Sequence, residues 1–134
     1  MAQYHVDIRN DRQEALQVGI QSGSLKFCSG SSAGALAVPS GGVILSEHAI
    51  AADAGSVASG QLVLDDADVA EDSSANNSGT ITYAVVVKDA VAVAKWLVPS
   101  QMSVVINGGS AGLTIAAGLP VDVDSLTVIE GNPA

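Results

Sequence analysis

Apolar and polar residues alternate with a period of two along much of the chain, and this pattern predicts β-strands with one buried face. Short runs of this kind occupy residues 24–28, 36–38, 43–50, 61–64, 102–107 and 113–116. Residues 121–124 and 126–130 alternate in opposite phases, so we expect a β-bulge at Asp124–Ser125. Glycine and proline residues separate these runs, as is typical of turns.

The strongest strand signal is a hairpin between Thr80 and Val98. Residues 80–87 are rich in β-branched side chains, and residues 91–98 return as a second strand that Pro99 ends. Lys88-Asp89-Ala90 supplies the turn. Because apolar residues occupy both faces near Val85 to Val87, we expect this pair to lie centrally in a sheet.

One segment ahead of the first strand has the helical period instead. Asn10 is a candidate N-cap, and Gln13 completes a capping box with it. Leu16 and Ile20 share one face at a spacing of four residues, and Gly23 is a suitable stop. We therefore predict a short helix that packs on a sheet and follows an N-terminal arm at residues 1–7.

The elements together predict a mainly β fold. Many short strands, turns of glycine and proline, and one short N-terminal helix are typical of an antiparallel β-sandwich or an open β-barrel. The 134 residues fit a single β-rich domain, 1–134, that ends in a flexible tail at residues 131–134. We find no fixed-period repeat, which argues against a solenoid or a propeller.

Composition narrows the range of possible functions further. Aromatic residues make up only 3 % of the chain, whereas ligand pockets usually recruit several. The net charge is −9 and the five basic residues are scattered, so we expect no nucleic-acid partner. The most apolar stretch, residues 81–98, contains Lys88, Asp89 and Lys95 and fails as a membrane span. The opening residues do not have the pattern of a signal peptide.

Few residues are candidates for chemistry. The carboxylates of Asp65 to Asp72 lack the spacing and the glycine of a calcium loop, which favours a solvated loop over a cation site. His5, His48 and Cys28 lie in unrelated segments, too few for a zinc site, and Cys28 reads as a buried hydrophobe. No Gly-x-Ser-x-Gly elbow is present. We predict no enzyme activity, no metal and no cofactor.

A small set of residues is a candidate for contacts with a partner. Trp96 follows Lys95 near a strand end, where it is either the main core aromatic, which we favour, or an interface anchor. Tyr4, His5 and Val6 lie in the N-terminal arm. An aromatic residue on such an arm either docks on a neighbouring subunit or folds back on its own domain.

Motifs at both ends carry a resemblance. Residues 8–16 read IRNDRQEAL and lead to GSLKF at 23–27, and residues 118–132 read GLPVDVDSLTVIEGN. PSGGV at 39–43 and SGTIT at 78–82 lie between them in the expected order. In these features the chain resembles a family of small virion structural proteins of tailed bacteriophages. It departs from the family at Ile8, where leucine is usual, and in the acidic segment 65–72.

The resemblance implies a β-rich fold and a structural role in the particle, with no catalytic residues. The function we favour is a capsid decoration, or cement, protein that binds the major capsid protein where capsomers meet. It would assemble in the host cytoplasm and lie on the capsid surface, as a homo-oligomer for which a trimer is the natural state at a three-fold seam. The alternatives are a neck or tail component and a carbohydrate- or host-binding module.

Overall fold

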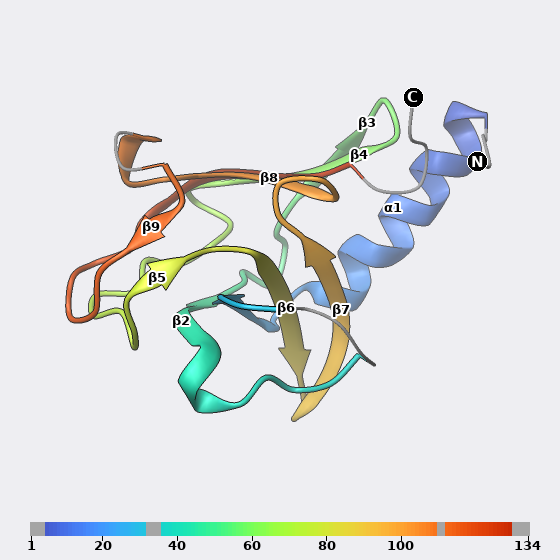
Figure 1. The fold of residues 1–134 in the computed structure, drawn as a ribbon. Helices are drawn as coiled ribbons and strands as arrows, with labels where there is room; N and C mark the ends of the chain where they lie inside the picture. The colour runs from blue at the N-terminus through green and yellow to red at the C-terminus, as the bar shows by residue number, and fades with distance from the viewer. Residues whose placement is uncertain (1–4, 32–35, 110–111, 130–134) are drawn as a thin grey trace.

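Two four-stranded antiparallel sheets and one helix form the protein in a computed structural model that describes residues 5–31, 36–109 and 112–129 (Figure 1). The helix is α1 (Val6–Ile20). The longer strands are β1 (Ser24–Cys28), β2 (Ile44–Ala49), β3 (Ser56–Ala58), β4 (Gln61–Asp65), β6 (Tyr83–Lys88), β7 (Val91–Leu97), β8 (Met102–Ile106) and β10 (Val123–Val128). A ribbon of β5 (Gly79–Thr80) and β9 (Thr114–Ile115) and two short 3-10 turns, Gly41–Val43 and Asn107–Gly109, complete the set.

The first sheet has the strand order β2-β1-β6-β7. β1 and β6 are its central strands, and Tyr83 to Val86 are buried in succession because both faces of the sheet are covered there. β6 and β7 form the hairpin predicted from the sequence, with Val85 opposite Lys95. Asp89 and Ala90 make its turn with φ of 54° and 64°. The predicted central position of this pair is confirmed for β6, whereas β7 is an edge strand.

The second sheet has the order β3-β4-β10-β8, so the last strand of the chain lies between two earlier ones. The register of β10 against β8 shifts between Val123 and Ser125, which confirms the predicted bulge. In Figure 1, β6 and β7 run steeply down the view whereas β8 and β4 run across it, so the strands of the two sheets cross. The mainly β, antiparallel fold expected from the sequence is confirmed.

The core lies between the two sheets. Its side chains are those that alternate inward along each strand, as the period of two requires. The largest of them are Leu25, Phe27 and Trp96 from the first sheet and Leu62, Leu64, Met102 and Leu126 from the second. A smaller apolar cluster, formed by Cys28, Ile44, Tyr83 and Val85, covers the other side of β1 and β6. This second cluster explains why both faces of these strands are apolar.

Three expectations need correction. The helix begins at Val6 with His5 as its N-cap, so the predicted capping box at Asn10 and Gln13 lies inside α1. The predicted N-terminal arm therefore loses its last two residues to the helix, and residues 1–4 lie outside the described part. Residues 36–38 form no strand, because the described chain between Leu36 and Ser40 follows an irregular path.

Candidate functional site

The acidic segment, defined here as Asp65 to Asp72, covers the outer edge of β2. Ala70 N–H donates to Ala49 O over 2.9 Å, and Ala51 N–H donates to Asp68 O over 2.9 Å. The carboxylate of Asp72 accepts from Glu47 N–H over 2.9 Å. The side chains of this segment are largely exposed, as expected of a solvated loop, but Ala70 and Asp72 also form hydrogen bonds to the edge strand β2. The prediction of a solvated loop is therefore correct for the side chains, but it did not include the hydrogen bonds to β2.

The same segment joins the two sheets on this side of the molecule. Asp72 N–H donates to Val121 O over 3.0 Å, and Val121 N–H donates to Asp72 O over 2.7 Å. Val121 lies just ahead of β10, so this pair connects the edge of the first sheet to the second. Two aspartates also hold the local turn, since Asp65 accepts from Ala67 N–H and Asp68 accepts from Asp65 N–H, each over 3.0 Å.

An acidic depression of about 450 Å³ lies beside this segment. It is lined by small apolar residues such as Ala49 and Val69 and by the carboxylates of Asp66, Asp68 and Asp122. The pKa of Asp122 is raised because it shares a hydrogen bond with the Asp66 carboxyl group and faces further carboxylates. Within the described residues, no three His, Cys, Asp or Glu side chains are grouped so that they could hold a metal ion.

His48 is buried beneath the acidic segment and connects it to β2. Its Nδ1 lies 2.7 Å from Ala70 O, and its Nε2 lies 2.9 Å from Ser46 Oγ. Nδ1 therefore carries the proton and donates to the carbonyl, and Nε2 accepts from the hydroxyl group. The ring of Phe27 contacts the imidazole edge-to-face. Burial lowers the pKa of His48 from its ordinary value of 6.5, so the ring is neutral at pH 7.

Cys28 lies on the opposite side of the first sheet, within the smaller apolar cluster. Burial raises the pKa of its thiol to about 11, and this outweighs the opposing effects of the Tyr83 hydroxyl group and Lys26. The thiol is therefore protonated at neutral pH, which confirms the expectation of a buried hydrophobe. Lys26 forms an ion pair with Glu47 across β1 and β2, and the pKa of Glu47 is lowered, mainly by that bond.

Of the residues predicted to contact a partner, Trp96 lies in the core whereas His5 and Val6 lie at the start of α1. Trp96 lies in the main core and is only 4 % exposed, which confirms the favoured prediction of a core aromatic. Its indole is therefore not presented at the surface. His5 is exposed at the start of α1, where its Nδ1 accepts from Asp7 N–H over 3.2 Å. Val6 is half-buried in the first turn, and Tyr4 lies outside the described residues. The structure therefore does not bring this set together.

Helix α1 packs on the β3–β4 hairpin through polar side chains. Gln17 Nε2 donates to Gly55 O over 2.8 Å, and Gln21 Nε2 donates to Ala54 O over 2.9 Å. Asn10 Oδ1 accepts from Gly60 N–H over 2.7 Å. Gly60 has a φ of +75°, which strains other residues, and an added Cβ would lie 2.7 Å from Arg9 Nη1 and would displace this guanidinium.

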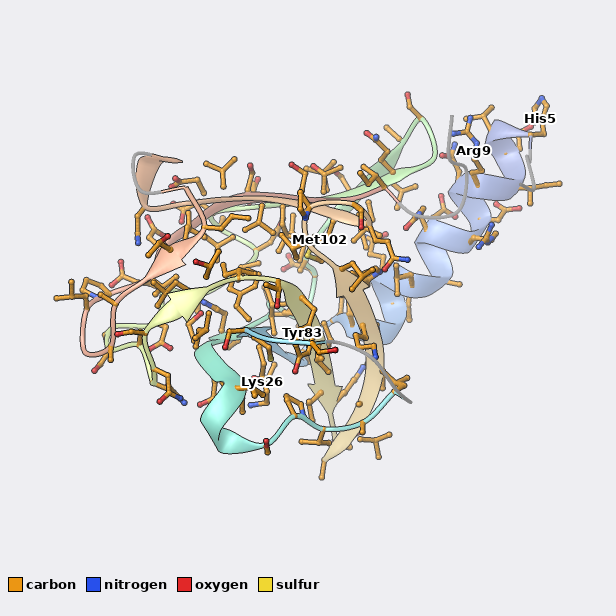
Figure 2. All side chains as sticks on the ribbon, viewed as in Figure 1. His5, Arg9, Lys26, Tyr83 and Met102 are labelled. Carbon is orange, nitrogen blue, oxygen red and sulfur yellow. The ribbon has the colours of Figure 1, made fainter. Side chains whose placement is uncertain are left out.

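The opposite face of α1 is exposed and partly apolar, with Ile8 50 % and Val18 66 % exposed. Figure 2 shows His5 and Arg9 at the outer end of the helix, which extends beyond the two sheets. The sequence contains a signal for this arrangement that the capping argument missed: Arg9, Gln13, Gln17 and Gln21 recur every four residues and so share one face.

No helix in the described ranges has the length and apolar character needed to cross a membrane. Comparison with protein-family models, with curated proteins and with solved structures finds no match to this chain. The functional assignment therefore depends on the residues and on the geometry described above.

Proposed function

We propose that this protein is a structural component of a tailed-bacteriophage virion, and that it decorates the outer capsid surface by binding the major capsid protein at capsomer junctions. Each copy would add apolar and hydrogen-bonded contact across a seam between capsomers. Summed over many copies, such contacts would help the shell to resist the pressure of packaged DNA. The role needs neither a cofactor nor an enclosed ligand site.

The observation that carries the proposal is where the resembling segments lie in the fold. Residues 8–16 belong to α1, residues 23–27 supply most of β1, and residues 118–132 include β10. β1 and β10 are interior strands, one in each sheet. The likeness to phage virion proteins thus involves the elements that define the architecture, which supports a relationship across the whole fold rather than a local coincidence.

The roles of the reactive side chains also support a structural function. His48 is held by Ala70 and Ser46, and Cys28 is a protonated thiol in an apolar cluster. Asp65, Asp68 and Asp72 accept main-chain hydrogen bonds that order the acidic segment. Each of these groups stabilises the fold.

The outer end of α1 is the surface that we assign to the shell contact. His5 lies there, exposed and away from the sheets (Figure 2), and Ile8, three residues further along α1, is 50 % exposed. Because the helix is held by polar contacts along its other face, Ile8 can be buried by a partner without disturbing the fold. This assignment replaces the contact strand at residues 2–7 of the N-terminal arm, with Tyr4, His5 and Val6, that the sequence indicated.

The other two functions receive less support. A carbohydrate-binding module presents aromatic rings for stacking, but Phe27, Tyr83 and Trp96 are all buried. A neck or tail component would use the same kind of surface as a decoration protein, and only its copy number would differ. The copy number is therefore the measurement that separates the two structural roles.

The first experiment is quantitative mass spectrometry of purified virions, with the major capsid protein as the internal reference. We expect hundreds of copies per particle in a simple ratio to the shell protein. About six or twelve copies would assign the protein to the neck or tail. Its absence from the particle would overturn the virion role.

A second experiment tests the contact surface. Ile8→Lys is expected to weaken binding to capsids that lack this protein at least tenfold, as measured by co-sedimentation, because it places a charge in an apolar contact. Val18→Lys is the matched control, since Val18 is exposed on the same helix at its other end. Equal binding by the two variants would refute the assignment of this helix end.

A further inference from the structure

The turn that follows β8 contains the pair Asn107-Gly108, and both residues are exposed to water. Their φ angles are 50° and 73°, in the left-handed region that such pairs favour. The main-chain nitrogen that follows an asparagine can attack the side-chain carbonyl carbon and close a succinimide ring, and glycine hinders this attack least because it has no side chain. Asn107 is the only asparagine of the sequence that precedes a glycine.

The carbonyl group that would be attacked is polarised by a main-chain donor. Asp122 N–H donates to Asn107 Oδ1 over 2.9 Å, and Asn107 N–H donates to Asp122 O over 2.8 Å. These two bonds fix the asparagine against the residues just ahead of β10. A donor at Oδ1 stabilises the negative charge that this oxygen gains when a nucleophile adds to Cγ.

The side-chain nitrogen that would leave is less restrained than those of two other asparagines. Nδ2 of Asn76 donates to Glu47 Oε2 over 2.9 Å, and Nδ2 of Asn77 donates to Ile44 O over 2.7 Å. In the described chain, no group accepts a hydrogen bond from Nδ2 of Asn107. Its departure as ammonia therefore breaks no contact of the fold.

The attacking nitrogen is held by a carboxylate. Gly108 N–H donates to Asp124 Oδ2 over 2.6 Å, a short charge-assisted bond. Asp124 lies at the bulge of β10, where the register against β8 passes from Val123 to Ser125 and gives Asp124 no partner. The bulge thus places a base at the proton that Gly108 N must lose before it can attack.

We propose that Asn107 is a site of self-modification, at which the fold promotes succinimide formation with Gly108. Gly108 N forms a bond to Asn107 Cγ and gives its proton to Asp124. The bond from Cγ to Nδ2 breaks, and Nδ2 takes this proton and leaves as ammonia. Water then opens the ring and leaves aspartate or isoaspartate at position 107. The site does not depend on the virion role, because it follows from the turn and its hydrogen bonds alone.

Modification should weaken this end of the second sheet. Either product adds a negative charge beside Asp122 and Asp124. Isoaspartate also adds a main-chain carbon ahead of Gly108, which moves the glycine N–H away from the Asp124 carboxylate. The connection from β8 to β9 should therefore be less stable in modified chains than in new ones.

The first test follows deamidation of the full wild-type chain at pH 7.5 and 37 °C by peptide mass spectrometry. In the folded protein we expect Asn107 to react at least about tenfold faster than Asn76 or Asn77. We also expect Asn107 to react at least about twofold faster in the folded protein than in guanidinium chloride, where the turn is lost. An equal or slower reaction in the folded protein would overturn the proposal, because the fold would then not promote it.

The second test removes the base. Asp124→Asn keeps the size of the side chain without its charge and should slow the reaction of Asn107 at least about fivefold in the folded protein, but not in denaturant. Asp53→Asn is the matched control, because it removes the same charge from an exposed turn ahead of β3. Equal rates for the two folded variants would refute the role of Asp124. A thermal melt verifies that each variant folds, and the wild-type comparison decides if Asp124→Asn does not.

Discussion

The two edge strands of the first sheet, β2 and β7, are completed in opposite ways. Along β2, the acidic segment donates a main-chain hydrogen bond to Ala49 O and accepts one from Glu47 N–H through the Asp72 carboxylate, and His48 lies beneath it against Ala70 O. β7 has exposed valines and a single clamp at Gln101. The most acidic segment of the sequence thus stabilises the fold, whereas the valines of β7 remain exposed.

The two edges should differ most in the loss of stability when one side chain is truncated on each. His48→Ala should lower the free energy of unfolding by about 3 kcal/mol, because it leaves a cavity and strands Ala70 O and Ser46 Oγ without their partner. Val93→Ala, on the open edge, should lower it by less than about 1 kcal/mol. Urea unfolding of both variants measures this, and equal losses would contradict the view that the two edges differ.

A smaller effect is expected from the hydrogen bonds at each edge. Asp72→Ala removes a carboxylate that accepts from Glu47 N–H and Ser74 N–H and should destabilise the fold by about 2 kcal/mol. Gln101→Ala removes one exposed bond to Leu97 N–H and should destabilise it by about 0.5–1 kcal/mol. If Gln101→Ala lowered the free energy of unfolding as much as Asp72→Ala, the hydrogen bonds at the edge of β7 would stabilise the fold as much as those at β2.

The covered edge should also be sensitive to pH. The pKa of His48 is lowered in the folded protein, so the unfolded chain binds a proton first as the pH falls through 6.5. The stability contribution of His48 is complete above this pH and declines below it, by at most about 1.4 kcal/mol per pH unit. We expect wild-type stability to fall between pH 7 and 5 more steeply than that of His48→Gln. Parallel profiles would assign the decline to other groups.

The smallest effect concerns the tip of the hairpin beside the open edge. Ala90 has a φ of 64°, a region that glycine adopts without strain, so Ala90→Gly should stabilise the fold by about 0.5–1 kcal/mol. Urea unfolding of Ala90→Gly and of the wild-type protein measures the difference. A loss of stability in the variant would show that the backbone at Ala90 is not strained.

The strands were largely predictable from the sequence because their periodicity is a local property. The hairpin and the bulge near Asp124 followed from residues next to one another in the chain. The start of the helix did not, since the amide oxygen of Asn10, which suits an N-cap, instead accepts a bond from Gly60, fifty residues away. Capping rules use only neighbouring residues, so they cannot identify a partner that is distant in the sequence.

The candidate surfaces were harder to predict for the same reason. Whether β7 is an edge or an interior strand depends on the strand order, which is set by contacts between distant segments. The acidic segment looked like a solvated loop because its side chains are charged, but its role comes from its main chain, which composition does not describe. The favoured prediction for Trp96, a position in the core, is confirmed.

The position of β10 has a consequence for biosynthesis. β10 supplies the strand between β4 and β8, so neither can complete its sheet until residues 123–128 have left the ribosome. From Ile106 to Val128 is 22 residues, about 1–4 s of translation at common rates. During this interval Leu62, Leu64 and Met102 lack the neighbour that buries them. The nascent chain is thus most vulnerable to aggregation between the synthesis of β8 and that of β10, and termination before β10 would leave that vulnerability permanent.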